Sequence, residues 1–246
     1  ELGGGTVTIL LCAFYPAKAL TQYCPCFPPH TDAMLAQNVA AEIRRAISRG
    51  EFSPGQKLNE VALAERFGVS RNTLREAFAM LTSEGLCERI PNRGVFLATP
   101  SPDFVTDTYR ARAAIEPAAL LWGEHLDVDR LHELNEEARE AITQDDDDLV
   151  AAINQTFHHV VLSAMGSKTL GDTMDQLDAF LRLATLPIVQ RTPTFNRQFI
   201  TVNERLVEML VEGRRQEASD YLQASLEEQG RIVNELIAKI NDGEPI

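Results

Sequence analysis

The feature that most constrains the fold is the order of elements in the first half of the chain. Apolar residues at helical spacing predict two short helices, over 60–67 and over 71–85. Asn59 and Ser70 precede these stretches, and both residue types cap helix N-termini. The segment 87–98 then predicts two short strands joined by a turn. Helix, turn, helix and hairpin in this order are typical of a winged helix-turn-helix.

The start of the second predicted helix carries side chains suited to DNA. Leu74 points inward, whereas Arg71, Asn72 and Arg75 fall on an exposed arc. Arginine can form paired hydrogen bonds with guanine, asparagine with adenine, and hydroxyl groups suit phosphates. A basic wing tip with a glycine could enter or flank the minor groove. For any one of these residues the alternative is a solvated helix face, but as a set they predict DNA contacts from Ser70, Arg71, Asn72, Thr73, Arg75, Arg93 and Gly94.

The charge distribution is compatible with DNA binding although the whole chain is acidic. The formal net charge is -13. Residues 34–97 hold nine Lys and Arg against seven Asp and Glu, whereas residues 98–246 hold thirteen against twenty-seven. Because the acidity lies in the C-terminal part, the net charge of the whole chain does not exclude nucleic acid as a partner.

The chain divides into three predicted parts. Residues 1–33 form an irregular extension, and residues 34–99 form the winged helix-turn-helix. Thr99-Pro-Ser-Pro102 marks a linker. Residues 100–246 predict about six helices, because loops of a few residues separate the helical stretches and suit an antiparallel bundle. The helix breaks are expected near 123–127, 145–148, 166–167, 187–193 and 213. The predicted fold class is therefore mainly α, with the winged helix-turn-helix followed by an all-α antiparallel helical bundle.

The N-terminal extension permits other interpretations. Cys24, Cys26 and His30 suggest a metal clip, but a second pair of ligands is missing. The apolar run 7–15 lacks a basic flank and is too short to span a bilayer, so we expect no membrane contact. We hypothesise that Met34 is the natural start and that the residues before it are not native. The chain's four cysteines form no disulfide framework, which favours a reducing, cytoplasmic setting.

Several stretches of the first half carry a family resemblance: Phe52-Ser-Pro-Gly-Gln-Lys-Leu-Asn-Glu60, Leu63-Ala64, Phe67-Gly-Val-Ser-Arg71, Leu74-Arg-Glu-Ala77, Glu84-Gly-Leu86 and Pro91-Asn-Arg-Gly-Val95. Together they resemble the DNA-binding domain of the GntR family over residues 36–97. The resemblance implies homodimers that bind an inverted-repeat operator, and it places on DNA the residues Ser70, Arg71, Asn72, Arg75 and Gly94. Many relatives have Thr-Pro where this chain has Asn72-Thr73, which leaves the base preference open.

The C-terminal half carries a looser resemblance, over roughly 104–230. The residues that carry it are Arg112-Ala-Ala-Ile-Glu116, Asn154-Gln-Thr-Phe-His158, Gly213 and Ala218. They resemble the FCD effector domain of the FadR subfamily. The resemblance implies a helical bundle that holds a small ligand, often a carboxylate, and frequently a divalent metal.

The metal-binding pattern of that domain is incomplete here. Metal-binding members have an Asp or Asn four residues before a His, and two further His on the last helices. By resemblance these positions are Asn154, His158, Asn203 and Ser225. One imidazole, two amides and a hydroxyl offer little to zinc or nickel. We therefore expect no tightly bound metal or other cofactor, with Asn154 and His158 as weak remaining candidates, and we expect the four side chains to hydrogen-bond a polar effector.

Arg112 has two interpretations. The resemblance implies a buried cation that pairs with an anionic effector, which would make it the fifth effector-binding residue. The alternative is an ion pair with Glu116, four residues later on the same helix.

These features predict a ligand-responsive transcriptional regulator, a repressor, that binds DNA as a dimer and responds to a small organic acid. We expect no enzyme, because the sequence shows no nucleophile–base pair and no glycine-rich phosphate loop. Two alternatives remain open. A helical-bundle metalloenzyme with a DNA-binding appendage predicts a bound metal. An architectural dimer without effector predicts that no metabolite changes its melting temperature.

Overall fold

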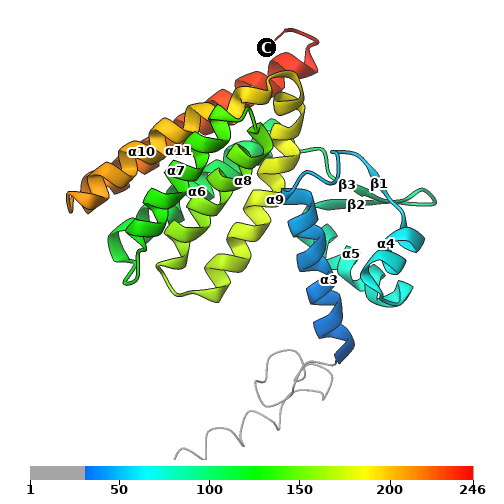
Figure 1. Cartoon of the computed structure of the whole chain (residues 1–246). Coiled ribbons are helices and arrows are strands. Elements are labelled where there is room, and N and C mark those ends of the chain that lie inside the picture. Colours follow the sequence, from blue (N-terminus) through cyan, green and yellow to red (C-terminus); the bar gives the residue numbers. More distant parts are fainter. Residues whose placement is uncertain (1–30, 246) are drawn as a thin grey trace, which may run out of the picture.

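The computed structural model describes residues 31–245 and arranges them as a small winged domain beside a larger helical bundle (Figure 1). The winged domain comprises α3 (Thr31–Ser48), β1 (Lys57–Leu58), α4 (Glu60–Phe67), α5 (Arg71–Ser83), β2 (Cys87–Ile90) and β3 (Gly94–Leu97). The bundle comprises α6 (Pro102–Trp122), α7 (Val128–Thr143), α8 (Asp147–Ser163), α9 (Lys168–Arg191), the 3-10 helix η1 (Pro193–Asn196), α10 (Arg197–Val211) and α11 (Arg215–Asn241). The predicted fold class is confirmed.

Local capping chemistry sets the two helices of the helix-turn-helix. The side chain of Asn59 accepts hydrogen bonds from the first backbone N–H groups of α4, and Gly68 ends that helix in the left-handed conformation. The side chain of Ser70 accepts a bond from the backbone N–H of Thr73 and so starts α5. The apolar face of α5 packs on α3, and Arg44 of α3 also pairs with Glu84 at the end of α5, 3.0 Å apart.

The wing is an antiparallel sheet in the order β1-β3-β2. The predicted hairpin corresponds to β2 and β3, with Arg89 opposite Val95. The sequence did not predict β1, in which Lys57 lies opposite Phe96. A strand of two residues has no alternation from which it could be recognised. The hairpin projects away from the rest of the molecule (Figure 1).

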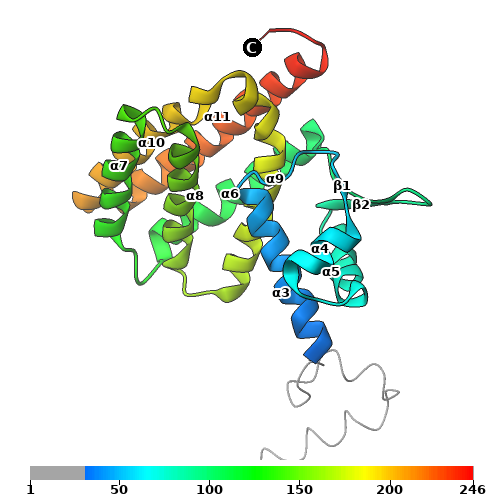
Figure 2. The ribbon, with the colours of Figure 1, turned by 45° about the vertical axis from the view of Figure 1, so that its right-hand side comes forward.

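Helix α9 connects the two domains. Its residues Ala179, Phe180 and Leu183 are buried in the apolar core of the winged domain, although the helix belongs to the bundle. The ring of Phe180 also packs on Phe104 near the start of α6, with 4.1 Å between ring centroids. Both views show α9 between α3 and the rest of the bundle (Figures 1 and 2). One helix therefore contributes to two cores.

Two element boundaries differ from the prediction. Helix α3 begins at Thr31, inside the predicted irregular extension, because no glycine or proline separates residue 31 from Met34. Helix α9 continues through Pro187 to Arg191, where a break was expected. A proline in a helix removes one hydrogen bond and costs about 3 kcal/mol. Burial of Leu186 and Ile188 on either side of the proline offsets that cost.

The predicted metal clip of Cys24, Cys26 and His30 and the apolar run 7–15 lie outside the described residues. Met34 lies inside α3, and its assignment as the natural start stays a hypothesis. Among the helices that the structure describes, none combines the length and the apolar composition needed to cross a bilayer.

Candidate DNA-binding surface and effector cavity

The N-terminal turn of α5 presents polar side chains to solvent. Arg71, Asn72 and Arg75 are exposed, as helical spacing predicted, and the N-cap residue Ser70 is exposed beside them. Arg75 is held in place by Glu60 on α4, because its Nε donates to that carboxylate at 3.0 Å. The other guanidinium nitrogens of Arg75 remain able to donate outward. The turn thus offers two arginines and an amide on one accessible face.

Thr73 differs from its neighbours. It is only 7% exposed, and its hydroxyl lies 2.9 Å from the hydroxyl of Ser70. The structure therefore places Thr73 in the helix cap beneath the exposed arc, where its hydroxyl orients Ser70.

The wing adds a second basic surface. The guanidinium of Arg93 lies 5.5 Å from the centre of the Phe96 ring, and Lys57 Nζ lies 6.0 Å from the same centre. Gly94 has φ +112, and a Cβ at that position would lie 3.2 Å from Lys57 Cε. The positive φ therefore favours glycine at this position, and a side chain there would also displace the end of Lys57. Lys57 was missed by the sequence analysis because β1 was missed.

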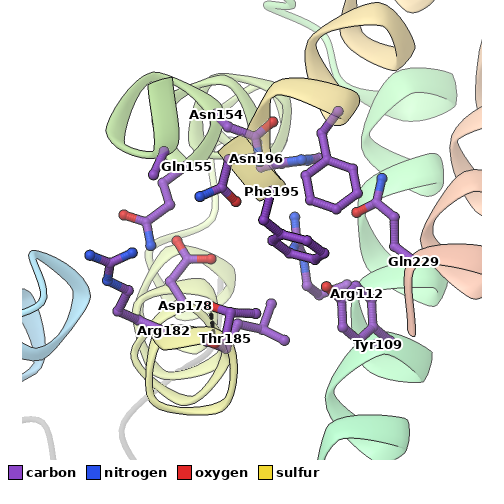
Figure 3. A pocket seen from close by; sticks show the side chains of 14 residues that line it. Tyr109, Arg112, Asn154, Gln155, Asp178, Arg182, Thr185, Phe195, Asn196 and Gln229 are labelled. Atoms are coloured by element: carbon purple, nitrogen blue, oxygen red, sulfur yellow. Dashed lines mark hydrogen bonds between the residues drawn. The ribbon is translucent and has the colours of Figure 1, made fainter. Parts of the chain in front are cut away.

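The bundle holds a cavity of about 50 Å³. Side chains from α6, α8, α9, η1, α10 and α11 converge on it (Figure 3). Its polar lining residues are Tyr109, Arg112, Asn154, Gln155, His158, Asp178, Arg182, Thr185, Asn196 and Gln229, and its apolar ones are Ala151, Leu181, Phe195 and Phe199. A polar cavity of this size accommodates water or a small polar ligand.

Three of the predicted effector-binding residues line this cavity: Arg112, Asn154 and His158. Asn203 is buried behind them and donates to Asn154 Oδ1 at 2.8 Å, so it orients a lining residue without reaching the cavity. Ser225 lies in a groove between α10 and α11 that shares Phe199 and Gln229 with the cavity. Gln229, on the next turn of α11, lines the cavity itself, whereas Ser225 does not.

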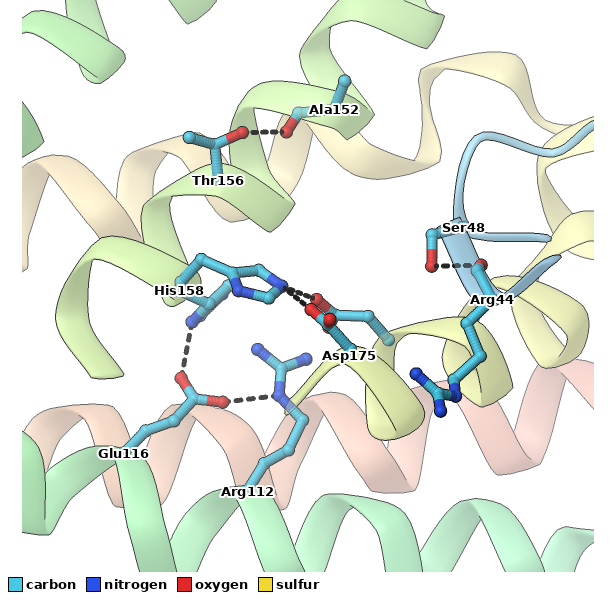
Figure 4. Close-up of polar contacts among 10 residues, drawn as sticks. Arg44, Ser48, Arg112, Glu116, Ala152, Thr156, His158 and Asp175 are labelled. Atoms are coloured by element: carbon cyan, nitrogen blue, oxygen red, sulfur yellow. Dashed lines mark hydrogen bonds and ion pairs between the residues drawn. The ribbon is translucent and has the colours of Figure 1, made fainter. Parts of the chain in front are cut away.

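Glu116 is the charged centre beside the cavity (Figure 4). Its carboxylate accepts a bond from Arg112 Nε at 2.5 Å and lies 2.6 Å from His158 Nδ1. Burial opposes ionisation of this carboxyl, but the charges of Arg112 and His158 outweigh burial and lower the pKa of Glu116 from 4.5 to about 2. The carboxylate is therefore ionised at neutral pH.

The two interpretations of Arg112 turn out to be compatible. Its Nε pairs with Glu116, whereas its buried Nη2 has no hydrogen-bond partner among the described residues. A buried donor without a partner is costly, and a ligand in the cavity would satisfy it.

Asp178 and Arg182 supply charge from α9, one helical turn apart. The carboxylate of Asp178 lies 2.6 Å from His159 Nε2, and this hydrogen bond raises the pKa of His159 above 6.5. Sequence reasoning missed both α9 residues. The i, i+4 spacing of an Asp and an Arg was visible, but nothing in the sequence showed which face of α9 meets the cavity.

The residues at the family's metal positions offer few ligands to a transition metal. The bond of His158 Nδ1 to Glu116 leaves only Nε2 of that ring for a metal, the Asn203 amide nitrogen donates to Asn154 Oδ1, and Ser225 does not line the cavity. Among residues 31–245 no group of three or more His, Cys, Asp and Glu side chains is arranged to hold a metal ion.

Family profiles match both halves of the chain. The profile described as bacterial regulatory proteins, gntR family, matches residues 35–97, and the FCD domain profile matches residues 107–228. The protein belongs to the GntR family. It is a transcriptional regulator that combines a GntR helix-turn-helix with an FCD domain, the FadR-like architecture. Members of this class are regulators, which are not enzymes.

Known relatives of this GntR regulator agree with that assignment. It is 27% identical over 150 residues to the uncharacterized HTH-type transcriptional regulator YdhC of Bacillus subtilis, covering 59% of this chain and 67% of YdhC. It is 38% identical over 63 residues to the HTH-type transcriptional repressor NagR of the same species, covering 25% of this chain and 26% of NagR. Many matches thus span well under two thirds of the relative.

A solved structure resembles this GntR regulator along most of its length. The crystal structure of a GntR transcriptional regulator from Rhodococcus sp. RHA1 superposes with a TM-score of 0.69 and 28% sequence identity. The match covers 80% of this chain and 96% of that chain.

The ion pairs of Glu116 generate a pH-dependent prediction. We expect Glu116→Gln to lower the free energy of unfolding at pH 7 by about 3 to 5 kcal/mol, because it leaves Arg112 buried without its counter-charge. A carboxyl whose pKa is lowered on folding stabilises the protein fully above its unfolded pKa, near 4.5, and this contribution is lost as the pH falls toward 2. Urea denaturation at pH 7 and at pH 3.5 measures the difference.

Glu204→Gln is the matched control, since Glu204 pairs with Arg139 on the surface. The gap between wild type and Glu116→Gln should narrow at the lower pH. An equal gap at both pH values would contradict the assignment of an ionised Glu116.

Proposed function

We propose that this GntR regulator is a repressor that binds an inverted-repeat operator as a homodimer and responds to a small organic anion. The DNA would be contacted by the exposed turn of α5 and by the wing, through Ser70, Arg71, Asn72, Arg75, Arg93 and Gly94. Thr73 would support this surface from beneath. The effector would occupy the bundle cavity, next to Arg112. The protein would act in the cytoplasm, where its operator lies.

The proposed binding of an anionic effector in the cavity rests on Arg112. Its buried Nη2 faces the polar cavity and has no hydrogen-bond partner among the described residues. A guanidinium nitrogen in such a site favours an anion, because charge-assisted hydrogen bonds are about twice as strong as neutral ones. Asn154 and Gln229 add amide groups that can orient a ligand.

The proposed dimer is supported by the way in which helix-turn-helix proteins commonly bind symmetric operators. One α5 reads one half-site, and two-fold symmetry of the protein matches two-fold symmetry of the operator. The repressor assignment is supported by the name of NagR, a transcriptional repressor similar to this chain over 63 residues.

The DNA-binding part is tested with the full chain and DNA flanking its own gene. We expect Arg71→Ala and Arg75→Ala each to weaken specific binding by about tenfold to hundredfold, because a bidentate contact to a base contributes about 1 to 3 kcal/mol. Fluorescence anisotropy at several salt concentrations separates this loss from the non-specific, salt-dependent attraction. Arg205→Ala is the control, since Arg205 pairs with Glu208 on α10. Wild-type affinity in both test variants would refute the surface assignment.

The effector part is tested by thermal shift with a panel of small carboxylates. A ligand that binds the folded protein alone raises its melting temperature. We expect Arg112→Lys to reduce that rise, because lysine keeps a cation beside Glu116 but lacks the free guanidinium nitrogen. Arg110→Lys, an exposed neighbour on α6, should respond like wild type. An unchanged response in Arg112→Lys, or no rise with any carboxylate, would count against the proposed site.

A further inference from the structure

A second guanidinium beside the cavity also has one nitrogen without a hydrogen-bond partner among the described residues. Arg182 lines the same cavity as Arg112, and its buried Nε has no hydrogen-bond partner among residues 31–245. The charged group nearest to Arg182 in the structure is the exposed Asp148, 3.6 Å from Nη2. Asp178, one turn earlier on α9, is engaged by His159 instead. The cavity therefore contains two cationic groups with unused donors.

The same edge of the Arg182 guanidinium, formed by Nε and Nη2, contacts the DNA-binding domain. Its guanidinium lies against Gly50, which follows the last turn of α3 with φ +76. A Cβ on Gly50 would lie only 2.6 Å from Arg182 Nη2, so a glycine is what makes this contact fit. Figure 3 shows the α3 ribbon passing close to Arg182. A cation at the C-terminal end of a helix is stabilised by the helix dipole.

Helix α3 in turn holds the DNA-reading helix. Its apolar face packs on α5, and Arg44 forms paired hydrogen bonds with Glu84 at the C-terminal end of α5. A change in the contact between Arg182 and the C-terminal end of α3 would therefore alter the position of α5.

We propose that Arg182 is a second anion-binding residue of the cavity and that it transmits ligand occupancy to the DNA-binding domain through the end of α3. An anion bound between Arg112 and Arg182 draws the Arg182 guanidinium toward the cavity and weakens its contact with Gly50. The proposal rests on the proposed effector site. The alternative is that Arg182 only stabilises the end of α3, in which case no ligand would depend on it.

Glu116 and Asp178 already compensate part of the positive charge, so the preference rests on the unused donors: two separate guanidinium groups favour a ligand with acceptor oxygens at two points, and the small cavity favours a compact one. A dicarboxylate of malonate size, or a tetrahedral dianion such as sulfate, meets both conditions. A monocarboxylate such as acetate carries one negative charge and two acceptor oxygens, and it therefore engages the two groups less fully.

The test uses the full chain with malonate, sulfate and acetate as probes. Titration calorimetry measures affinity, and hydrogen exchange of peptides spanning residues 44–58 reports on the end of α3. In wild type we expect malonate or sulfate to bind and to speed exchange in this segment. Arg182→Gln should weaken malonate or sulfate at least tenfold, change acetate binding less than threefold, and abolish the exchange response.

Arg191→Gln is the matched control, because Arg191 lies on the same helix, is exposed and, among residues 31–245, has a side-chain bond only to the carbonyl of Pro187. Arg182→Lys serves as a second variant if the glutamine variant unfolds, and should retain part of the affinity. Wild-type affinity for malonate and sulfate in the Arg182 variants would overturn the proposal while leaving the effector cavity intact. The proposal would also be overturned if malonate or sulfate bound to the wild type without changing the hydrogen exchange of residues 44–58. No binding of any probe to wild type would contradict the anionic effector itself.

Discussion

The two-sided packing of α9 is the constraint on which the rest of the structure depends. Ala179, Phe180 and Leu183 complete the apolar core of the winged domain, so the bundle and the DNA-binding domain cannot separate without exposing that face. The same helix turns Asp178 and Arg182 toward the cavity. An event in the cavity therefore acts on a helix that is already fixed to the DNA-binding domain.

Buried charge gives the cavity its chemical character. Glu116 neutralises one buried arginine and leaves part of that arginine's hydrogen-bonding capacity unused. Buried ion pairs contribute little net stability, because desolvation cancels much of their attraction. Unsatisfied guanidinium nitrogens lower stability further. This arrangement is unfavourable for folding alone and supports the proposed ligand site, which lies in the region that the FCD domain profile matches.

The elements that local chemistry determines could be predicted from the sequence. Asn59, Ser70 and Gly68 fix the ends of α4 and α5, and the exposed arc of Arg71, Asn72 and Arg75 follows from helical spacing alone. The order of domains and the six α-helices after the linker follow from breaks that Gly, Asp and Pro signal in the sequence.

Features that depend on tertiary contacts could not be predicted. The strand β1 exists only through pairing with β3, and Pro187 is tolerated because its neighbours are buried. The cavity collects side chains from six elements, so Arg182 and Gln229 could be found only once those elements were placed. The family spacing, counted forward from Gly213, predicted Ser225 as a site residue. Gln229, one turn further along α11, is the residue of that helix that lines the cavity.

The central claim is that a symmetric pair of these chains reads DNA with the exposed turn of α5. Selection of bound sequences from a random DNA pool by the full-length protein, followed by sequencing, tests it most directly. The account predicts enrichment of two half-sites related by inverted symmetry, with their centres one helical turn of DNA apart or a multiple of it. Enrichment of a single asymmetric site, or of no sequence at all, would contradict it.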